Sequence, residues 1–462
     1  MASSPNQPFD RLHPSPDWVG ARVPQTRMAS IRSILPLASL IYVCLVFPPE
    51  VAFNAGGLNL TAYRIALAVL IGPAVLSYVK GETRFSLPDA LVFVGSLWMI
   101  IAFINLFGPV DGVIRSLAIV LDALGAFLVA RTSLRSHDDF RRLLVIVAPA
   151  FFLAGLILAV ESIFHTIIYR PFFAQFFGNV QMYEAGNAVG GLEYRTDQRA
   201  GLMRAYSTFS HPIHAGVTLS SLLPLYYFSG IRGWPRWVGI GTSFLGIFSV
   251  SSVSFLVIAI GAGMIAVDVF KRRLRYVTWP VISAILGGIL AALHIGSQSG
   301  VIYLIIRYTF SPHNGYVRIT QWETALKAMS DRPWFGWGYD PIPLPIWLPP
   351  SIDAHFLALG LRSGVITAIL LYAAAIFCIT LLGSRVRFFD EENRNLMVGL
   401  NISVFLLLFA SLTVTYFGET NIYFMAVLGI IASFCQVAPK NASARNSRAL
   451  AVHSTAMHRQ TR

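Results

Sequence analysis

Apolar runs long enough to cross a bilayer fill most of this chain, and they constrain its fold more than any other feature. A helix needs about 20 apolar residues to cross roughly 30 Å of hydrocarbon. With 55% hydrophobic and 12% charged residues among 462, the composition excludes the soluble class and indicates a polytopic membrane protein. We expect an all-α fold with about 12 transmembrane helices. Their expected starts are near Ile34, Thr61, Asp89, Gly112, Arg142, Pro212, Arg236, Val253, Tyr276, Phe356, Leu396 and Glu419.

The spans form one predicted transmembrane domain, residues 34–436, between two polar tails. Residues 1–33 are rich in Pro and Ser, and residues 437–462 in Ala, Ser and Arg, so both are predicted to be disordered. Two long polar loops, about 166–210 and 296–355, interrupt the apolar pattern. A protein that was only anchored in the membrane would not need such loops, so we expect the functional residues to lie in them.

The net charge of +13 follows the membrane topology rather than a nucleic-acid surface. Most Lys and Arg residues fall in the tails and in the segments that alternate with the two long loops, which predicts cytoplasmic termini and outward loops. Cys44, Cys378 and Cys435 lie within apolar spans, so they predict no disulfide framework and no metal site.

Ionisable residues within spans are costly unless they are paired or face a cavity, which makes each one a functional candidate. Arg64, Arg115, Asp122, Glu161 and Arg362 stand in such positions. We expect the first two arginines to reach the outer interface and Asp122 to pair with one of them. For Glu161, a helix hydrogen bond and a catalytic role stay open.

In the first loop, residues 167–178 carry several aromatic side chains with Arg170, a pattern that suits an interfacial helix in the headgroup layer. Such a helix could also line lateral access for a lipid carrier. Arg204 and His211 lie directly before the span at Pro212. Their position at the membrane surface makes them candidates for substrate binding.

In the second loop, Arg318 is predicted to open a short amphipathic helix that contains Trp322 and ends at Pro333. A helix N-terminus with an arginine beside it would bind phosphate. A stretch dense in Pro and Trp follows. Asp353 and His355 then hold the last polar positions before the next span, where either could accept a hydroxyl proton.

Three segments of the chain resemble the O-antigen ligase and Wzy-type polysaccharide polymerase superfamily of bacterial inner-membrane glycosyltransferases, over roughly residues 58–434. Residues 204–216 resemble its arginine, small turn and His-Pro pair. Residues 318–338 resemble its arginine-to-tryptophan helix followed by Pro-x-x-Gly-x-Gly. Residues 351–364 resemble the signature that closes its large periplasmic loop.

The closing signature differs from the ligase pattern, which has His-Asn and, two residues before its Gly, a Glu. Here Asp353 and Ala354 stand at the His-Asn position and Arg362 at the Glu position. The segment is more similar to exopolysaccharide polymerases with Val/Ile-Asp-Asn, although Ala354 replaces their Asn. The Ser-Arg pair often found after the seventh span is also absent, since residues 251–254 read Ser-Ser-Val-Ser.

The resemblance implies a GT-C-like, metal-independent inverting glycosyltransferase without cofactors, in the bacterial inner membrane. It would polymerise undecaprenyl-diphosphate-linked repeat units into exopolysaccharide or O-antigen on the periplasmic face, with a chain-length regulator as a further partner. Paired arginines would hold the diphosphate through bidentate hydrogen bonds. The candidate residues are Asp353 and His355 for catalysis, and Arg204, Arg318, His211 and Trp322 for substrate binding.

Other functions stay open at this point. An O-antigen ligase would use lipid A core as the acceptor. A flippase or transporter would place polar residues at mid-membrane on broken helices in two matching halves, and the sequence has no convincing repeat. An O-acyltransferase would place a His deep in a cytoplasm-facing funnel, whereas the histidines map to the outer ends of spans.

Overall fold

The computed structural model describes residues 25–55, 58–178, 182–184, 187–189, 197–273, 288, 292, 295–296, 312–348 and 352–436. Helices make up most of this part of the chain, and its strands form only two-stranded hairpins. Most of both predicted tails and the predicted span near Tyr276 lie outside the described residues.

Within the described residues, 8 helices are long and apolar enough to cross a membrane. They confirm an all-α, multi-pass membrane protein, although their number is below the 12 expected. They are α2 (Ala62–Val79), α3 (Leu87–Phe107), α4 (Pro109–Val120) continued through the π-turn η1 (Leu121–Gly125) into α5 (Ala126–Ser133), α6 (His137–Phe164), α11 (Ser252–Arg273), α16 (Val365–Arg385), α17 (Glu391–Ser411) and α18 (Gly418–Gln436).

Other predicted spans are short or broken. The apolar part of α1 covers only Ser33–Val46. The helix expected from Pro212 breaks because Pro224 has no N–H to donate to the carbonyl one turn earlier, at Ser220. The elements concerned are α1 (Gln25–Val46), α8 (Pro212–Ser220), α9 (Leu222–Phe228), α10 (Trp234–Leu245) and the 3-10 turn η2 (Gly246–Ser249).

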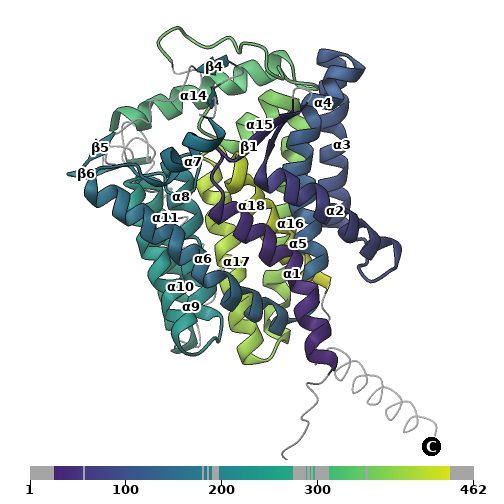
Figure 1. Ribbon diagram of the computed structural model, residues 1–462, viewed down its shortest axis with the longest axis vertical. Coiled ribbons are helices and arrows are strands. Elements are labelled where there is room, and N and C mark those ends of the chain that lie inside the picture. Colours follow the sequence, from purple (N-terminus) through teal and green to yellow (C-terminus); the bar gives the residue numbers. More distant parts are fainter. Residues whose placement is uncertain are drawn as a thin grey trace, which may run out of the picture.

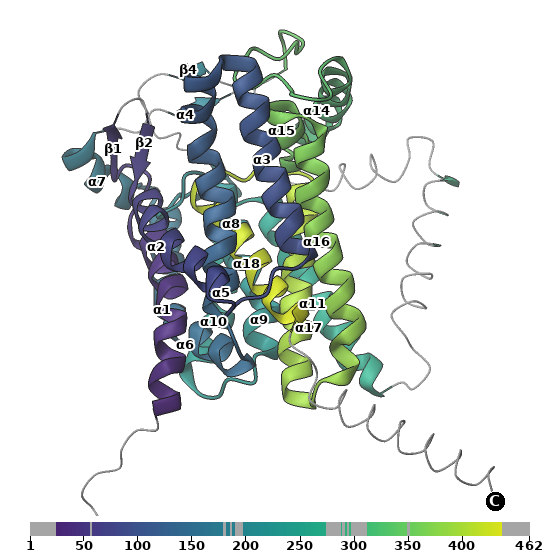
Figure 2. The ribbon, with the colours of Figure 1, turned by 90° about the vertical axis from the view of Figure 1, so that its right-hand side faces the viewer.

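The most buried span is α18, with 89% of its apolar window inside the bundle. Figures 1 and 2 show it surrounded by other helices, with α5 and α16 beside it. A Cβ at Gly429 would overlap the backbone carbonyl of Phe127 on α5. Small residues therefore let the two helix backbones approach closely, as is common between membrane helices.

The predicted pairing of Asp122 is confirmed. Its Oδ2 lies 2.7 Å from Nη2 of Arg64, and the carboxylate sits on the π-turn η1. The Arg115 guanidinium instead lies 4.7 Å from the centre of the Phe107 ring. Direct hydrogen bonding is what makes a buried ion pair tolerable, since both ions lose their water.

Short helices and hairpins gather at one end of the bundle, opposite the start of α1 (Figure 2); we call it the loop end. The predicted interfacial helix is present as α7, with Phe172 54% and Phe176 69% exposed. The elements of this end are β1 (Ala52–Ala55) paired antiparallel with β2 (Leu58–Thr61), α7 (Tyr169–Phe177), β3 (Met182–Glu184) paired with β4 (Asn187–Val189), α14 (Pro312–Asp331) and α15 (His355–Ser363).

The span expected from Phe356 begins later, at Val365. Gly364 has φ +88°, and a Cβ there would overlap the carbonyl oxygen of Trp334. Only glycine fits this conformation and this close approach, so the chain turns and α15 is separate from α16. Arg362 consequently lies at the end of α15 rather than inside a span.

Candidate functional site

Asp353 lies in extended residues directly before α15, at the loop end. Its Oδ2 is 3.9 Å from Nε of Arg318 on α14, and its backbone N–H donates to Oε1 of Gln321 at 3.4 Å. Residues three apart share one face of a helix. The face of α14 with Arg318 and Gln321 therefore holds the carboxylate in place.

The prediction that Arg318 opens its helix is wrong. The helix α14 begins at Pro312 and ends at Asp331, just before Pro333. Proline suits the first helical position, because its missing N–H would have no intrahelical partner there. Arg318 lies in the second turn, so its cation rather than a helix N-terminus faces Asp353.

Arg204 follows the hairpin of β5 (Gln198–Arg199) and β6 (Leu202–Met203) in the first loop. Its N–H donates to the carbonyl of Asp197 at 2.9 Å, and its Nη1 lies 3.4 Å from Oδ2 of the same residue. The side chain is only 9% exposed, and its buried Nε has no hydrogen-bond partner among the described residues. A buried donor without a partner is uncommon, which makes this guanidinium a candidate for binding an anion.

The charges of Arg318 and Arg204 both act on Asp353, which brings the two loops together at one carboxylate. Burial is the largest effect and raises the pKa of Asp353, while Arg318 and then Arg204 lower it; the net direction is upward. Burial lowers the pKa of each arginine, and the Arg199 charge lowers both further. The result is a partly dehydrated surface on which Arg199, Arg204 and Arg318 outnumber the two acids Asp197 and Asp353, so a net positive charge would favour a bound anion.

His355 has different surroundings, although it stands two residues from Asp353. Its Nδ1 accepts the N–H of Tyr416 at 3.3 Å, and the two rings lie 5.2 Å apart. The side chain is buried, and burial followed by the Arg362 charge lowers its pKa to about 3. His355 is therefore neutral near pH 7 and carries its proton on Nε2.

His211 begins α8, and its Nδ1 accepts the N–H of Ile213 at 3.2 Å. Burial lowers its pKa, and the charges of His214 and Arg204 lower it further. The rings of His211 and His214 are 5.8 Å apart. His211 is thus a neutral cap at the start of α8, within range of the Arg204 charge.

A short connection between α17 and α18, residues 412–417, contacts the second loop at two places. The sequence analysis did not identify it. Nε1 of Trp322 donates to the carbonyl of Leu412 at 3.1 Å. The hydroxyl of Thr415 donates to the carbonyl of Ile352, next to Asp353. The predicted substrate-binding Trp322 therefore uses its N–H to hold this connection. The polar and aromatic residues of this segment, which stand between two apolar spans, could have identified it from the sequence.

Glu161 is fully buried and accepts three backbone N–H groups, from Ile168 at 3.0 Å, Tyr169 at 2.9 Å and Ser207 at 2.8 Å. Hydrogen bonds to a carboxylate are stronger than neutral ones. Of the two roles left open for Glu161, the observed contacts are those of an anchor. It ties both ends of the first loop to the top of α6.

A second carboxylate, Glu419 at the start of α18, accepts the N–H of Ser210 at 2.5 Å and its hydroxyl at 2.9 Å. Arg170 also reaches this segment, donating to the carbonyl of Ser210 at 3.2 Å. Arg170 is 1% exposed and pairs with Glu50 at 2.6 Å, so the expectation that it lies in the headgroup layer is wrong. Its burial fixes the backbone between Arg204 and α8.

The Pro-x-x-Gly-x-Gly motif, residues 333–338, packs the segment after α14 against the junction of α15 and α16. The N–H of Trp337 donates to the carbonyl of Leu361 at 2.6 Å, and the N–H of Val365 donates to that of Pro333 at 2.9 Å. A Cβ at Gly336 would overlap the carbonyl of Leu361. The motif thus sets the spacing between α14 and α15, the elements that carry Arg318 and Asp353.

No family model and no curated protein matches the chain. Within the described ranges, no group of three or more His, Cys, Asp or Glu side chains is arranged to hold a metal ion. The arrangement of Asp353, Arg318 and Arg204 at the loop end is therefore the main indication of function.

Proposed function

We propose that this chain is a GT-C-like inverting glycosyltransferase that polymerises undecaprenyl-diphosphate-linked repeat units on the periplasmic face of the bacterial inner membrane. The supporting observation is the convergence of Asp353, Arg318 and Arg204 from two loops at one end of a membrane bundle. The resemblance of three segments supports it as well. We also propose 12 crossings, with α1, α8–α9 and α10 added to the 8 long helices; the expected span near Tyr276 lies outside the described residues.

The arrangement suits a single displacement at the anomeric carbon of the donor. The acceptor hydroxyl oxygen attacks that carbon from the face opposite the diphosphate, and the proton of the hydroxyl passes to Asp353. The bond from the anomeric carbon to the diphosphate oxygen breaks, and its electron pair leaves with the diphosphate. Arg204 and Arg318 stabilise that charge. Attack from the opposite face gives inversion.

Asp353 is better placed than His355 to act as the base. The Asp353 side chain is 43% exposed and faces two arginines. His355 is 4% exposed, and its Nδ1 is occupied by a backbone N–H. A base must reach the proton that it removes, and only the carboxylate is open to a substrate.

The test is an assay of purified variants in proteoliposomes with a lipid-linked repeat unit. Arg204→Ala and Arg318→Ala are each expected to lower the rate of polymer formation at least about 100-fold, the scale of losing one transition-state donor. Lysine at either position is expected to restore little, because a point charge does not reproduce a planar fork. Lys327→Ala, at an exposed position of α14, is the matched control and should stay near the wild-type rate.

Wild-type rates from both alanine variants would remove the arginines from the mechanism and contradict the proposal. Glycan transfer to lipid A core, without lipid-linked polymer, would indicate the ligase instead. Movement of the lipid-linked unit across the bilayer without new glycosidic bonds would indicate a flippase.

A further inference from the structure

A hollow of about 360 Å³ lies at the end of the bundle opposite the loop end. Its walls come from the residues before α3 and from the ends of α16 and α18. These three helices are membrane spans, so the hollow is at the level where apolar helices end and lipid headgroups begin. Its size is that of a small-molecule site. It is separate from the candidate glycosyl-transfer site.

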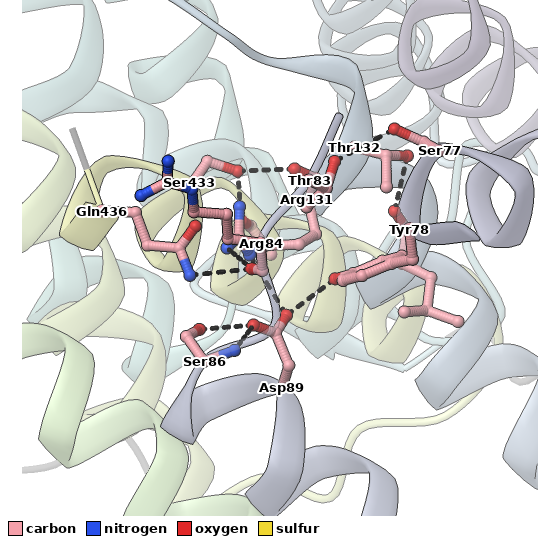
Figure 3. Close-up of polar contacts among 12 residues, drawn as sticks. Ser77, Tyr78, Thr83, Arg84, Ser86, Asp89, Arg131, Thr132, Ser433 and Gln436 are labelled. Carbon is pink, nitrogen blue, oxygen red and sulfur yellow. Dashed lines mark hydrogen bonds and ion pairs between the residues drawn. The ribbon is translucent and has the colours of Figure 1, made fainter. Parts of the chain in front are cut away.

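Two arginines line the hollow. Arg385 uses Nη1 to donate to the carbonyl of Cys435, the last turn of α18. The backbone at Arg84 is also fixed, since its carbonyl accepts Nε2 of Gln436 at 2.8 Å and Nη2 of Arg131 at 3.1 Å (Figure 3). The side chain of Arg84 is exposed and has no hydrogen-bond or ion-pair partner in the described part of the chain.

The acids near the hollow are already engaged. Asp89 accepts Nε of Arg131 at 3.1 Å and the hydroxyl of Tyr78 at 2.7 Å, as Figure 3 shows. Glu82 pairs with Arg135 at 2.6 Å. Neither carboxylate lines the hollow. The two arginines that line the hollow therefore have no carboxylate among the other lining residues to neutralise them, a state that favours binding of an anion.

Apolar side chains form the rest of the surface. Phe85 is 64% and Leu87 is 52% exposed, and they line the hollow together with Phe377 and Leu381 of α16. A soluble anion would leave these groups in contact with water, at an unfavourable free energy. Cations next to apolar side chains at a span boundary instead match a molecule with a charged head and hydrocarbon chains.

We propose that this hollow binds an anionic phospholipid of the adjacent leaflet. Arg84 and Arg385 hold the headgroup phosphate, and Phe85, Leu87 and Phe377 contact the first part of the acyl chains. Guanidinium groups bind phosphate through paired, charge-assisted hydrogen bonds. Two guanidinium charges exceed the single charge of a phosphodiester, so a headgroup that adds another cation, such as choline, binds less well.

The test uses the full-length protein in vesicles of phosphatidylglycerol and phosphatidylcholine, each in turn carrying a photoreactive acyl chain. Labelling by the phosphatidylglycerol probe is expected on residues 84–88 and 377–385, and unlabelled phosphatidylglycerol should compete while phosphatidylcholine and glycerol phosphate should not. Arg84→Gln and Arg385→Gln are each expected to lower labelling about fivefold, the effect of one basic residue near a membrane surface. Arg135→Gln, nearby but outside the hollow, should leave labelling unchanged.

Arg84→Gln is the decisive variant, because its side chain holds no other part of the fold, whereas Arg385 supports the end of α18. Equal labelling by both lipid probes, or unchanged labelling in Arg84→Gln, would overturn the proposal. Competition by glycerol phosphate would overturn it in favour of a soluble anion. None of these readouts uses glycosyl transfer, so the result does not depend on the proposed function.

Discussion

Asp353 and His355 are two residues apart, yet their surroundings give them opposite roles. Asp353 keeps part of its surface open and has two cations nearby. His355 is enclosed by Tyr416 and Phe424 and accepts a backbone N–H. A buried neutral imidazole with a pKa of about 3 contributes packing and a hydrogen bond, while the carboxylate, whose pKa burial raises, is open to take up a proton.

We therefore predict that Asp353→Asn lowers the rate of polymer formation more than tenfold relative to His355→Gln. The general base acts when deprotonated, so the wild-type rate should fall as pH falls through the pKa of Asp353, which burial raises above the ordinary value of about 3.9. Asp353→Asn should abolish this acid limb, and His355→Gln should retain it. A limb that survives in Asp353→Asn and disappears in His355→Gln would assign the base to His355. Rate profiles of purified, folded variants against pH are the measurement.

At the scale of elements, the position of α15 depends on one backbone conformation. We predict that Gly364→Ala lowers both thermal stability and activity, since the left-handed conformation costs a non-glycine residue about 1–2 kcal/mol and the new Cβ would overlap the carbonyl of Trp334. Gly263→Ala is the control, because it lies inside α11 with no atom within 4 Å of its new Cβ. Thermal unfolding in detergent is the measurement, and equal unfolding temperatures for the two variants would refute the role given to Gly364.

For the whole molecule, the charge distribution predicts which end faces the cytoplasm. A phosphatase reporter inserted within residues 338–350 should be active, and one fused after residue 439 should be inactive, because basic segments stay on the cytoplasmic side. The opposite pattern would place the loop end in the cytoplasm and exclude periplasmic chemistry at Asp353. A reporter with the inverse compartment dependence, fused at the same positions, is the control for expression.

The sequence by itself determined the properties that add up along a segment. The free energy of moving a helix into hydrocarbon is a sum over about 20 neighbouring residues, so the long spans and the polar loops could be predicted. That Asp122 pairs with one of two arginines could be predicted too, because an isolated charge in a span needs a partner; the structure decides for Arg64. The same local reasoning identified α7 from its aromatic residues.

Only the tertiary structure decided which distant groups meet. The burial of Arg170, the carboxylate anchors at Glu161 and Glu419, and the 412–417 connection depend on contacts between segments up to 209 residues apart. Hydropathy contains no information on such contacts, because many packings satisfy the same pattern. The difference between Asp353 and His355 has the same origin: which of the two lies open to a substrate is set by where Tyr416 packs, and that residue comes from another helix connection far along the chain.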